Sequence, residues 1–154
     1  MPDFFLKRIK MRLLKPIISA TLLLAYLSGN AQTLSLKFTN VRSKEGFFRV
    51  GFFTDEGSYK SGDPKYYVSV SKNSLKDGQL ICMLDTIQPG TYGIAVLDDE
   101  NGNDKTDYSF ILFPKEGFGL SNYPITKVEI PRFDDFKFNY LGNELVVEIR
   151  MKYL

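Results

Sequence analysis

The chain has 154 residues, of which 44% are hydrophobic and 25% charged, so its length and composition are those of one folded domain. It contains no His and a single Cys, Cys82. These counts exclude a Ser-His-Asp triad, a Cys-His pair and a closed zinc site, because each needs residue types that the chain lacks. The sequence therefore favours a protein that is not an enzyme.

Residues 1–31 have the three parts of a secretory signal peptide: a basic start, an apolar core over residues 17–27, and the small residues Gly29 and Ala31 before a cleavage point. The core is 11 residues long, whereas a transmembrane helix needs about 20. We therefore expect export to the periplasm or the extracellular space, and a mature domain over residues 32–154 without a transmembrane anchor. Translation that starts at Met1 or at Met11 would in either case give a complete signal peptide.

Cleavage after residue 31 reverses the sign of the net charge. The whole chain has 20 basic and 18 acidic residues, and residues 1–31 hold five of the bases and one of the acids. The mature chain, with 15 bases and 17 acids, has a formal charge of −2, which gives no support for nucleic acid as a partner. Cys82 lies in an apolar run that predicts a buried side chain. Because it is the single cysteine of the sequence, an internal disulfide is impossible.

Apolar and polar residues alternate with a period of two along most of the mature chain, which indicates half-buried β-strands. Clusters of Gly, Pro, Asn and Asp separate these runs. No window of helical length shows helical spacing, although residues 71–76 could form one helical turn. The pattern predicts an all-β fold, a single antiparallel immunoglobulin-like β-sandwich of seven to eight strands. The expected strands lie at residues 34–38, 48–52, 66–70, 80–84, 92–96, 110–113, 136–140 and 145–151.

An acidic segment with alternating Asp and Asn follows the strand expected at residues 92–96. Counted as a calcium loop, its oxygen ligands at positions 1, 3, 5, 7 and 9 would be Asp99, Asn101, Asn103, the Lys105 carbonyl and Asp107. The glycine and the final glutamate of an EF-hand are missing, so we expect weak Ca²⁺ binding. The alternative is that Asn101-Gly102 is only a hairpin turn.

Residues 114–122 form a second candidate, a segment interrupted by glycines that is predicted as a loop. Loops on a rigid β-scaffold are where such folds keep their binding residues. The alternative is a structural loop that packs Phe118 as its own small core. The candidate binding residues are Lys115, Glu116, Phe118, Ser121 and Asn122.

Two pairs of neighbouring acids keep open a second function class, a carboxylate-based glycan-active enzyme. They are Asp98 with Asp99, and Asp134 with Asp135. Neighbouring residues of a strand point apart, so this spacing does not provide the separation that the two carboxylates of a glycosidase need.

The chain resembles a bacterial family known as domain of unknown function 2141, from about residue 36 to residue 150. The resemblance depends most on residues 89–92, on residues 95–103 with Asp107, on residues 114–122, and on Pro131, Phe133 and Phe138. It implies a small exported β-sandwich protein with no established activity. Leu112 and Phe136 depart from the family pattern, which puts any ligand of the second segment in doubt.

A shorter similarity, over the Pro-Gly-Thr-Tyr strand and the Asp/Asn segment, links the chain to transthyretin-like and collagen-adhesin B-type sandwiches. Taken together, these observations predict an exported, non-catalytic binding or structural module of the bacterial envelope. Its expected partner is an envelope protein or a glycan, and Ca²⁺ is the one cofactor that the sequence suggests.

Overall fold

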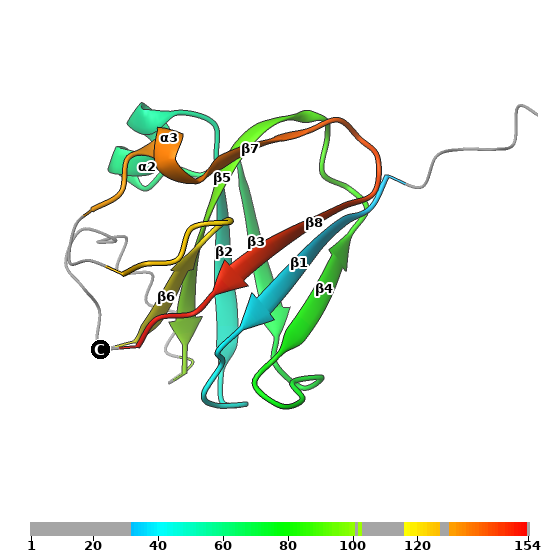
Figure 1. Cartoon of the computed structure of the whole chain (residues 1–154), viewed down its shortest axis with the longest axis vertical. Coiled ribbons are helices and arrows are strands. Elements are labelled where there is room, and N and C mark those ends of the chain that lie inside the picture. Colours follow the sequence, from blue (N-terminus) through cyan, green and yellow to red (C-terminus); the bar gives the residue numbers. More distant parts are fainter. Residues whose placement is uncertain (1–31, 101, 103–115, 127–129, 154) are drawn as a thin grey trace, which may run out of the picture. The chain divides into compact units, whose positions relative to one another are not determined.

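The strands of the chain form two sheets that face each other, as Figure 1 shows. In this computed structural model the described residues are 32–100, 102, 116–126 and 130–153. The small sheet has the strand order β4 (Leu80–Leu84), β1 (Leu34–Thr39), β8 (Leu145–Arg150). The large sheet has the order β3 (Tyr66–Ser71), β2 (Phe47–Phe53), β5 (Gly90–Asp99), β6 (Gly117–Leu120), and β7 (Lys137–Tyr140) also pairs with β5. The predicted β-sandwich is confirmed.

One strand pair differs from the antiparallel sandwich that the sequence predicts. β1 and β8 run parallel, in the register Leu34 opposite Leu145 to Thr39 opposite Arg150, whereas the other paired strands of the described residues are antiparallel. A parallel pair needs a long connection, and here nearly the whole domain lies between the two strands. No local pattern in the sequence predicts that β1 and β8 pair in parallel.

The main core lies between the two sheets. The inward residues of β2 and β5 alternate with outward ones, and Phe38 of β1 stacks on Phe48 of β2 with ring centroids 4.4 Å apart. Burial of these side chains removes apolar surface from water, which is the dominant stabilising contribution to such a domain. The core therefore fixes the two sheets against each other and determines which face of β5 each side chain occupies.

A second apolar cluster covers the outer face of the large sheet. It consists of Phe53, Tyr59, Ala95, Leu120, Phe133 and Phe136, and it packs the short helices α2 (Glu56–Ser61) and α3 (Phe133–Phe136) onto the sheet. β5 is consequently buried on both faces. At Gly93 a Cβ atom would lie 2.5 Å from the Phe136 ring, so the absence of a side chain allows α3 to pack closely.

Both helices correct the sequence-based expectation, which placed only one possible helical turn, at residues 71–76. That segment is extended and then turns, with the Leu75 N–H donating to the Lys72 carbonyl. α2 has only six residues and one buried side chain, so no helical periodicity could reveal it. Its ends did carry signals, because Asp55 caps the N-terminus by accepting from the Ser58 N–H, and Gly62 ends the helix at φ 70°.

Two of the predicted segments lie outside the described residues, namely the signal peptide at residues 1–31 and the strand at residues 110–113. Within the described part of the chain, no helix is long and apolar enough to span a membrane. The segment at Gly117–Leu120, predicted as a loop, is instead strand β6, paired with β5 from Leu120 opposite Ala95 to Gly117 opposite Asp98.

Candidate functional site

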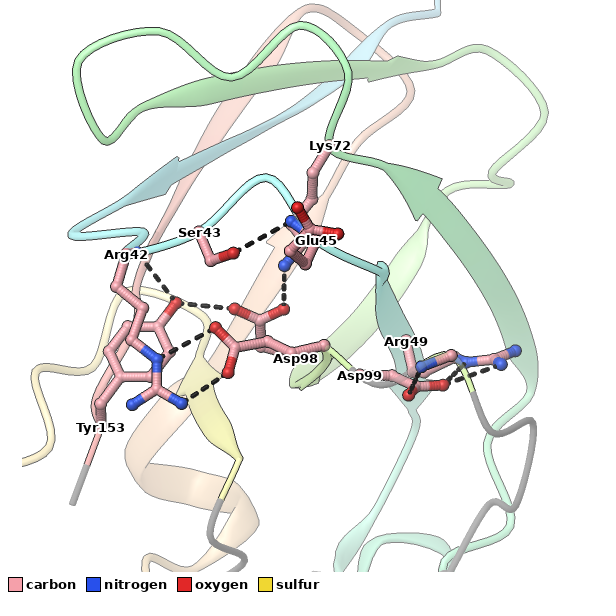
Figure 2. Close-up of polar contacts among 10 residues, drawn as sticks. Arg42, Ser43, Glu45, Arg49, Lys72, Asp98, Asp99 and Tyr153 are labelled. Atoms are coloured by element: carbon pink, nitrogen blue, oxygen red, sulfur yellow. Dashed lines mark hydrogen bonds and ion pairs between the residues drawn. The ribbon is translucent and has the colours of Figure 1, made fainter.

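The end of β5 carries three consecutive acids, Asp98, Asp99 and Glu100, at the point where the candidate calcium loop begins. Because side chains alternate along a strand, Asp98 follows Tyr92, Ile94 and Val96 into the space between the sheets. Figure 2 shows Asp98 beside Lys72 and Asp99 beside Arg49. Glu100 pairs with a third basic side chain, Arg42. We call this set of acids and their partners the charge cluster.

Asp98 is the buried centre of the charge cluster. Its Oδ1 lies 2.5 Å from Lys72 Nζ, and both side chains have an exposed fraction of 0%. Its Oδ2 accepts a hydrogen bond of 2.7 Å from the Tyr153 hydroxyl. Burial raises the pKa of the Asp98 carboxyl above its usual range, and the hydrogen bonds from Lys72 and Tyr153 oppose that rise.

Lys72 reaches Asp98 from the residue after β3, which is separated from β5 by β2. Its Nζ lies 5.4 Å from the centroid of the Phe48 ring, which is within the range of a cation–π contact. A fully buried lysine is rare unless it is paired. The pairing with Asp98 is therefore the interaction that allows Lys72 to occupy this apolar place.

Asp99 lies on the opposite face of the large sheet and binds Arg49. Its Oδ2 accepts from Arg49 Nε at 3.0 Å and lies 2.9 Å from the second guanidinium nitrogen, and both side chains are largely buried. Its Oδ1 accepts from the Gly102 N–H at 2.9 Å. Both carboxylate oxygens thus have protein donors, which hold the start of the loop against β2.

Glu100 makes the third ion pair, with Arg42. The Arg42 Nε and terminal nitrogen donate to the two carboxylate oxygens at 3.0 and 2.5 Å, and this contact lowers the pKa of Glu100. The same guanidinium lies 4.4 Å above the Tyr153 ring centroid, and the Arg42 N–H donates to the Tyr153 hydroxyl oxygen. Arg42 therefore connects the exposed and the buried parts of the charge cluster.

The loop between β1 and β2 packs directly against this end of β5. Gly46 has a φ of +69°, and a Cβ there would lie 1.7 Å from the Asp99 carbonyl oxygen. A side chain is excluded both by conformation and by space. The close approach brings Arg42 and Arg49, at either side of this turn, within reach of the acids.

Glu116 joins the acidic end of β5 from the second sequence-predicted segment. Burial raises the pKa of its carboxyl, and so do the negative charges of Asp99, Asp98 and Glu100. The two predicted segments thus meet at Glu116, beside the register pair Asp98 and Gly117. Lys115 lies outside the described residues.

Ser121 and Asn122, two of the candidate binding residues, lie at the other end of β6 and make contacts that hold the fold together. The buried Ser121 hydroxyl accepts from the Ile94 N–H at 2.9 Å and donates to the Phe136 carbonyl at 2.7 Å. The Asn122 side chain accepts from the Glu148 N–H, and its backbone N–H donates to the Glu148 carbonyl. Phe118 lies in β6 itself and is half-buried. These residues join the two sheets.

A hollow of about 340 Å³ adjoins this second region. It is open to solvent, and the residues that line it are Asn122, Tyr123, Pro124, Glu148 and Arg150. Its volume is at the lower end of the range typical of small-molecule sites. Among the described residues, the lining of the hollow includes no member of the charge cluster and one predicted site residue, Asn122.

The candidate calcium ligands lie mostly outside the described residues: Asn101, Asn103, Lys105 and Asp107. Asp99, the first of them, is described, and Arg49 and the Gly102 N–H contact its carboxylate. Among the described residues, no group of three or more Asp, Glu, Cys or His side chains is placed to hold a metal ion. The residue types of the candidate set still supply the oxygen ligands that Ca²⁺ needs. Asp99, however, would share its carboxylate between Ca²⁺ and the Arg49 guanidinium.

The candidate glycosidase pairs do not converge. Asp98 and Asp99 occupy opposite faces of the large sheet, each in its own ion pair. Asp134 and Asp135 lie in the first turn of α3, where Asp134 pairs with Lys137 and Asp135 accepts from the Arg132 N–H. Alternation along the strand and side-chain capping of the helix explain both arrangements.

Sequence reasoning missed the basic and aromatic members of the charge cluster: Arg42, Arg49, Lys72 and Tyr153. A weak signal was present for Arg49, which interrupts a run of apolar residues in β2 and so predicts a paired charge. No comparable signal marked Lys72, because it follows a strand directly and resembles an ordinary surface lysine. Its burial depends on the neighbouring sheet.

The fold and the charge cluster define a small β-sandwich domain whose acidic strand end is balanced by three basic side chains of its own. The chain belongs to the family described as an uncharacterised protein conserved in bacteria (DUF2141), whose model matches residues 36–148. No curated protein and no solved structure matches it.

Proposed function

We propose that the protein is an exported, non-catalytic binding or structural module of the bacterial envelope. The observation that carries this proposal is the pairing within the charge cluster: Asp98, Asp99 and Glu100 contact Lys72, Arg49 and Arg42, respectively. A general acid or base must be able to exchange a proton with a substrate. Carboxylates that are engaged by neighbouring cations serve better as structural anchors.

The charge cluster is well suited to support the loop that follows Asp99. Three ion pairs and the Gly102 contact fix the strand end from which that loop leaves. Ligand-binding residues of β-sandwiches commonly lie on loops that a rigid scaffold positions. We therefore place the binding function of the module at this end of β5.

Within this proposal, the loop binds Ca²⁺ weakly through Asn101, Asn103, the Lys105 carbonyl and Asp107, with Asp99 as a shared ligand. Alternating Asp and Asn supply the hard oxygen ligands that Ca²⁺ prefers. Arg49 opposes binding, because its positive charge already occupies Asp99 Oδ2 and repels a second cation. Weak affinity follows from that competition and suits a compartment with abundant calcium.

Thermal unfolding at constant ionic strength tests the calcium site. At a free Ca²⁺ concentration about ten times the dissociation constant, binding adds about 1.4 kcal/mol to the free energy of unfolding. We expect Ca²⁺ at about 10 mM to raise the melting temperature more than Mg²⁺ does, and the Asp99→Ala/Asp107→Ala variant to lose the difference. If Ca²⁺ and Mg²⁺ shift the melting temperature equally, or if the variant keeps the larger Ca²⁺ response, the segment does not bind calcium specifically and the alternative of a hairpin turn holds.

The partner that we propose is a protein of the envelope, because large apolar side chains of the small sheet are exposed on its outer face. Ile81, Met83 and Val146 are exposed there by 60%, 73% and 56%, and the register places Met83 and Val146 on either side of Ser35. Large exposed apolar side chains grouped on one face are typical of protein interfaces.

A glycan panel separates this proposal from its alternative, a carboxylate-based glycan-active enzyme. We expect no turnover of any glycan by the purified protein. Turnover that Asp98→Asn or Asp134→Asn abolishes, while the variant keeps its fold, would replace the proposal with the enzyme. Asp85→Asn, which changes an exposed acid outside the charge cluster, is the matched control.

A further inference from the structure

The segment that follows β6 runs along the edge of β8, where the small sheet ends. The order β4-β1-β8 gives β8 one neighbouring strand, and on its other side Ile149 pairs with Ser121 in an isolated antiparallel bridge. Asn122 then takes the place of a strand partner. Its backbone N–H donates to the Glu148 carbonyl at 2.7 Å, and its side-chain oxygen accepts from the Glu148 N–H at 3.1 Å. Two hydrogen bonds therefore fix Asn122 beside Glu148.

The hollow of about 340 Å³ lies where this segment meets β8, since its lining comes from both. Tyr123 packs against the apolar cluster on the outer face of the large sheet, and the ring of Pro124 restricts the backbone that follows. One wall of the hollow is therefore held in place before any ligand arrives. A wall that is already ordered lowers the entropy cost of binding.

Two opposite charges line the hollow from the same face of β8. Glu148 and Arg150 are two residues apart on the strand, so their exposed side chains leave it on one side. Among the described residues, neither has an ion-pair partner, and they do not pair with each other. The Thr39 hydroxyl donates to Glu148 Oε1 at 3.4 Å, and Oε2 accepts no hydrogen bond from the described part of the chain. The hollow thus differs from the charge cluster, where each acid has a basic partner.

Asn122 adds neutral donors to these charges. Its Oδ1 is occupied by the Glu148 N–H, so the two N–H groups of Nδ2 remain to donate to a ligand. A guanidinium such as that of Arg150 binds a carboxylate through two parallel hydrogen bonds, and a carboxylate such as that of Glu148 binds an ammonium group. A ligand that satisfies all three side chains therefore carries a carboxylate and an ammonium group close together.

We propose that the hollow binds the zwitterion of a free α-amino acid. The ligand carboxylate contacts Arg150 and the Asn122 amide, the ammonium group contacts Glu148, and the ligand side chain lies against Tyr123 and Pro124. Both charged groups of an α-amino acid are attached to one carbon atom, which suits two side chains that leave a strand about 6.7 Å apart. The volume, at the lower end of the range for small-molecule sites, suits a ligand of this size. This site is independent of the calcium loop and goes beyond the proposed function.

Titration of the ¹⁵N-labelled full chain with L-leucine, followed by NMR, tests the proposal. We expect saturable shifts of the amide signals of Asn122, Glu148 and Arg150, with a dissociation constant of about 1 mM, because ion pairs of exposed side chains are weak. N-acetyl-L-leucine lacks the ammonium group and L-leucinamide lacks the carboxylate, so each should bind at least about tenfold more weakly.

Two results of this titration would overturn the proposal. If N-acetyl-L-leucine binds as tightly as L-leucine, the hollow recognises a carboxylate and not a zwitterion. If L-leucine at about 50 mM causes no saturable shift of these three signals, the hollow is not a site for α-amino acids.

Variants assign the two charges. Arg150→Met should weaken L-leucine binding at least about tenfold. Glu148→Gln should bind L-leucine and N-acetyl-L-leucine equally, because the ammonium group has lost its partner. Lys152→Met is the matched control: it removes an exposed cation of the same chain segment that does not line the hollow, and its affinity should equal that of the unchanged protein.

The three substituted side chains are exposed, so each variant should keep the fold, which its own amide spectrum checks. Unchanged L-leucine affinity in Arg150→Met would contradict the proposal. Equal weakening in Arg150→Met and Lys152→Met would show a general attraction to positive charge, which would contradict it as well.

Discussion

Asp98 and Asp99 are consecutive residues of β5, and their carboxylates lie on opposite faces of the large sheet. Asp98 contacts Lys72 and Tyr153 between the two sheets, whereas Asp99 contacts Arg49 on the other face. The period of two along a strand imposes this separation. One strand end therefore anchors two independent charged contacts, one on each face of the large sheet.

The ion pair between Arg49 and Asp99 should compete with calcium. Arg49→Met removes the cation, so we expect the variant to lose about 1.5–3 kcal/mol of unfolding free energy without Ca²⁺ and to show a larger stabilisation by Ca²⁺ than the unchanged protein. Urea unfolding with Ca²⁺ or EDTA measures both effects. A calcium response that is unchanged or smaller in Arg49→Met would mean that Asp99 is not a ligand.

Ser121 should contribute to stability and not to ligand binding. Its hydroxyl satisfies the Ile94 N–H and the Phe136 carbonyl in a buried place. Ser121→Ala leaves the polar groups of β5 and α3 without that partner, and we expect a loss of about 1–3 kcal/mol in unfolding free energy. Ser69→Ala, at an exposed position of β3, is the matched control and should change stability by less than about 0.5 kcal/mol.

Gly93 should be intolerant of even the smallest side chain. A Cβ there would lie 2.5 Å from the Phe136 ring and 2.9 Å from the Phe133 ring. Gly93→Ala must displace α3 from the large sheet, which we expect to cost about 1–3 kcal/mol. Thr91→Ala, an exposed change in the same strand, separates this clash from a general effect on β5. Equal stability of the two variants, measured by urea unfolding, would argue against the tight contact.

Glu56 should make the attachment of α3 sensitive to acid. Its carboxylate accepts the Phe133 N–H at 2.6 Å and pairs with Lys60, and these contacts lower the pKa of Glu56, the Phe133 N–H most of all. A lowered folded-state pKa means that this stabilisation is complete above the unfolded value of about 4.3 and is lost as the pH falls through the folded value.

Melting temperatures measured across this acidic range test the effect. Glu56→Gln should flatten the dependence of the melting temperature on pH below about 4.3. Lys60→Met should keep most of that dependence, because the Phe133 N–H is the larger cause of the lowered pKa. If Lys60→Met flattens the profile as much as Glu56→Gln does, the contact between α2 and α3 is not the cause.

Much of the fold followed from local patterns. The alternation in residues 34–38, 48–52 and 145–151 predicted β1, β2 and β8, because a half-buried strand imposes a period of two on its own residues. β6 was missed because it is four residues long and contains two glycines, too few alternating side chains for a pattern. α3, also four residues long, was missed for the same reason.

The sequence by itself determined that segments such as β1, β2 and β8 are strands and that the end of β5 is acidic, since both properties belong to residues that are neighbours in the chain. Only the tertiary structure decided the partners of those acids. Lys72 lies 26 residues before Asp98, and Tyr153 lies 55 residues after it. Whether a charge is buried or solvated depends on which strands the two sheets bring together, and that is settled by the packing of the whole core and not by any local spacing.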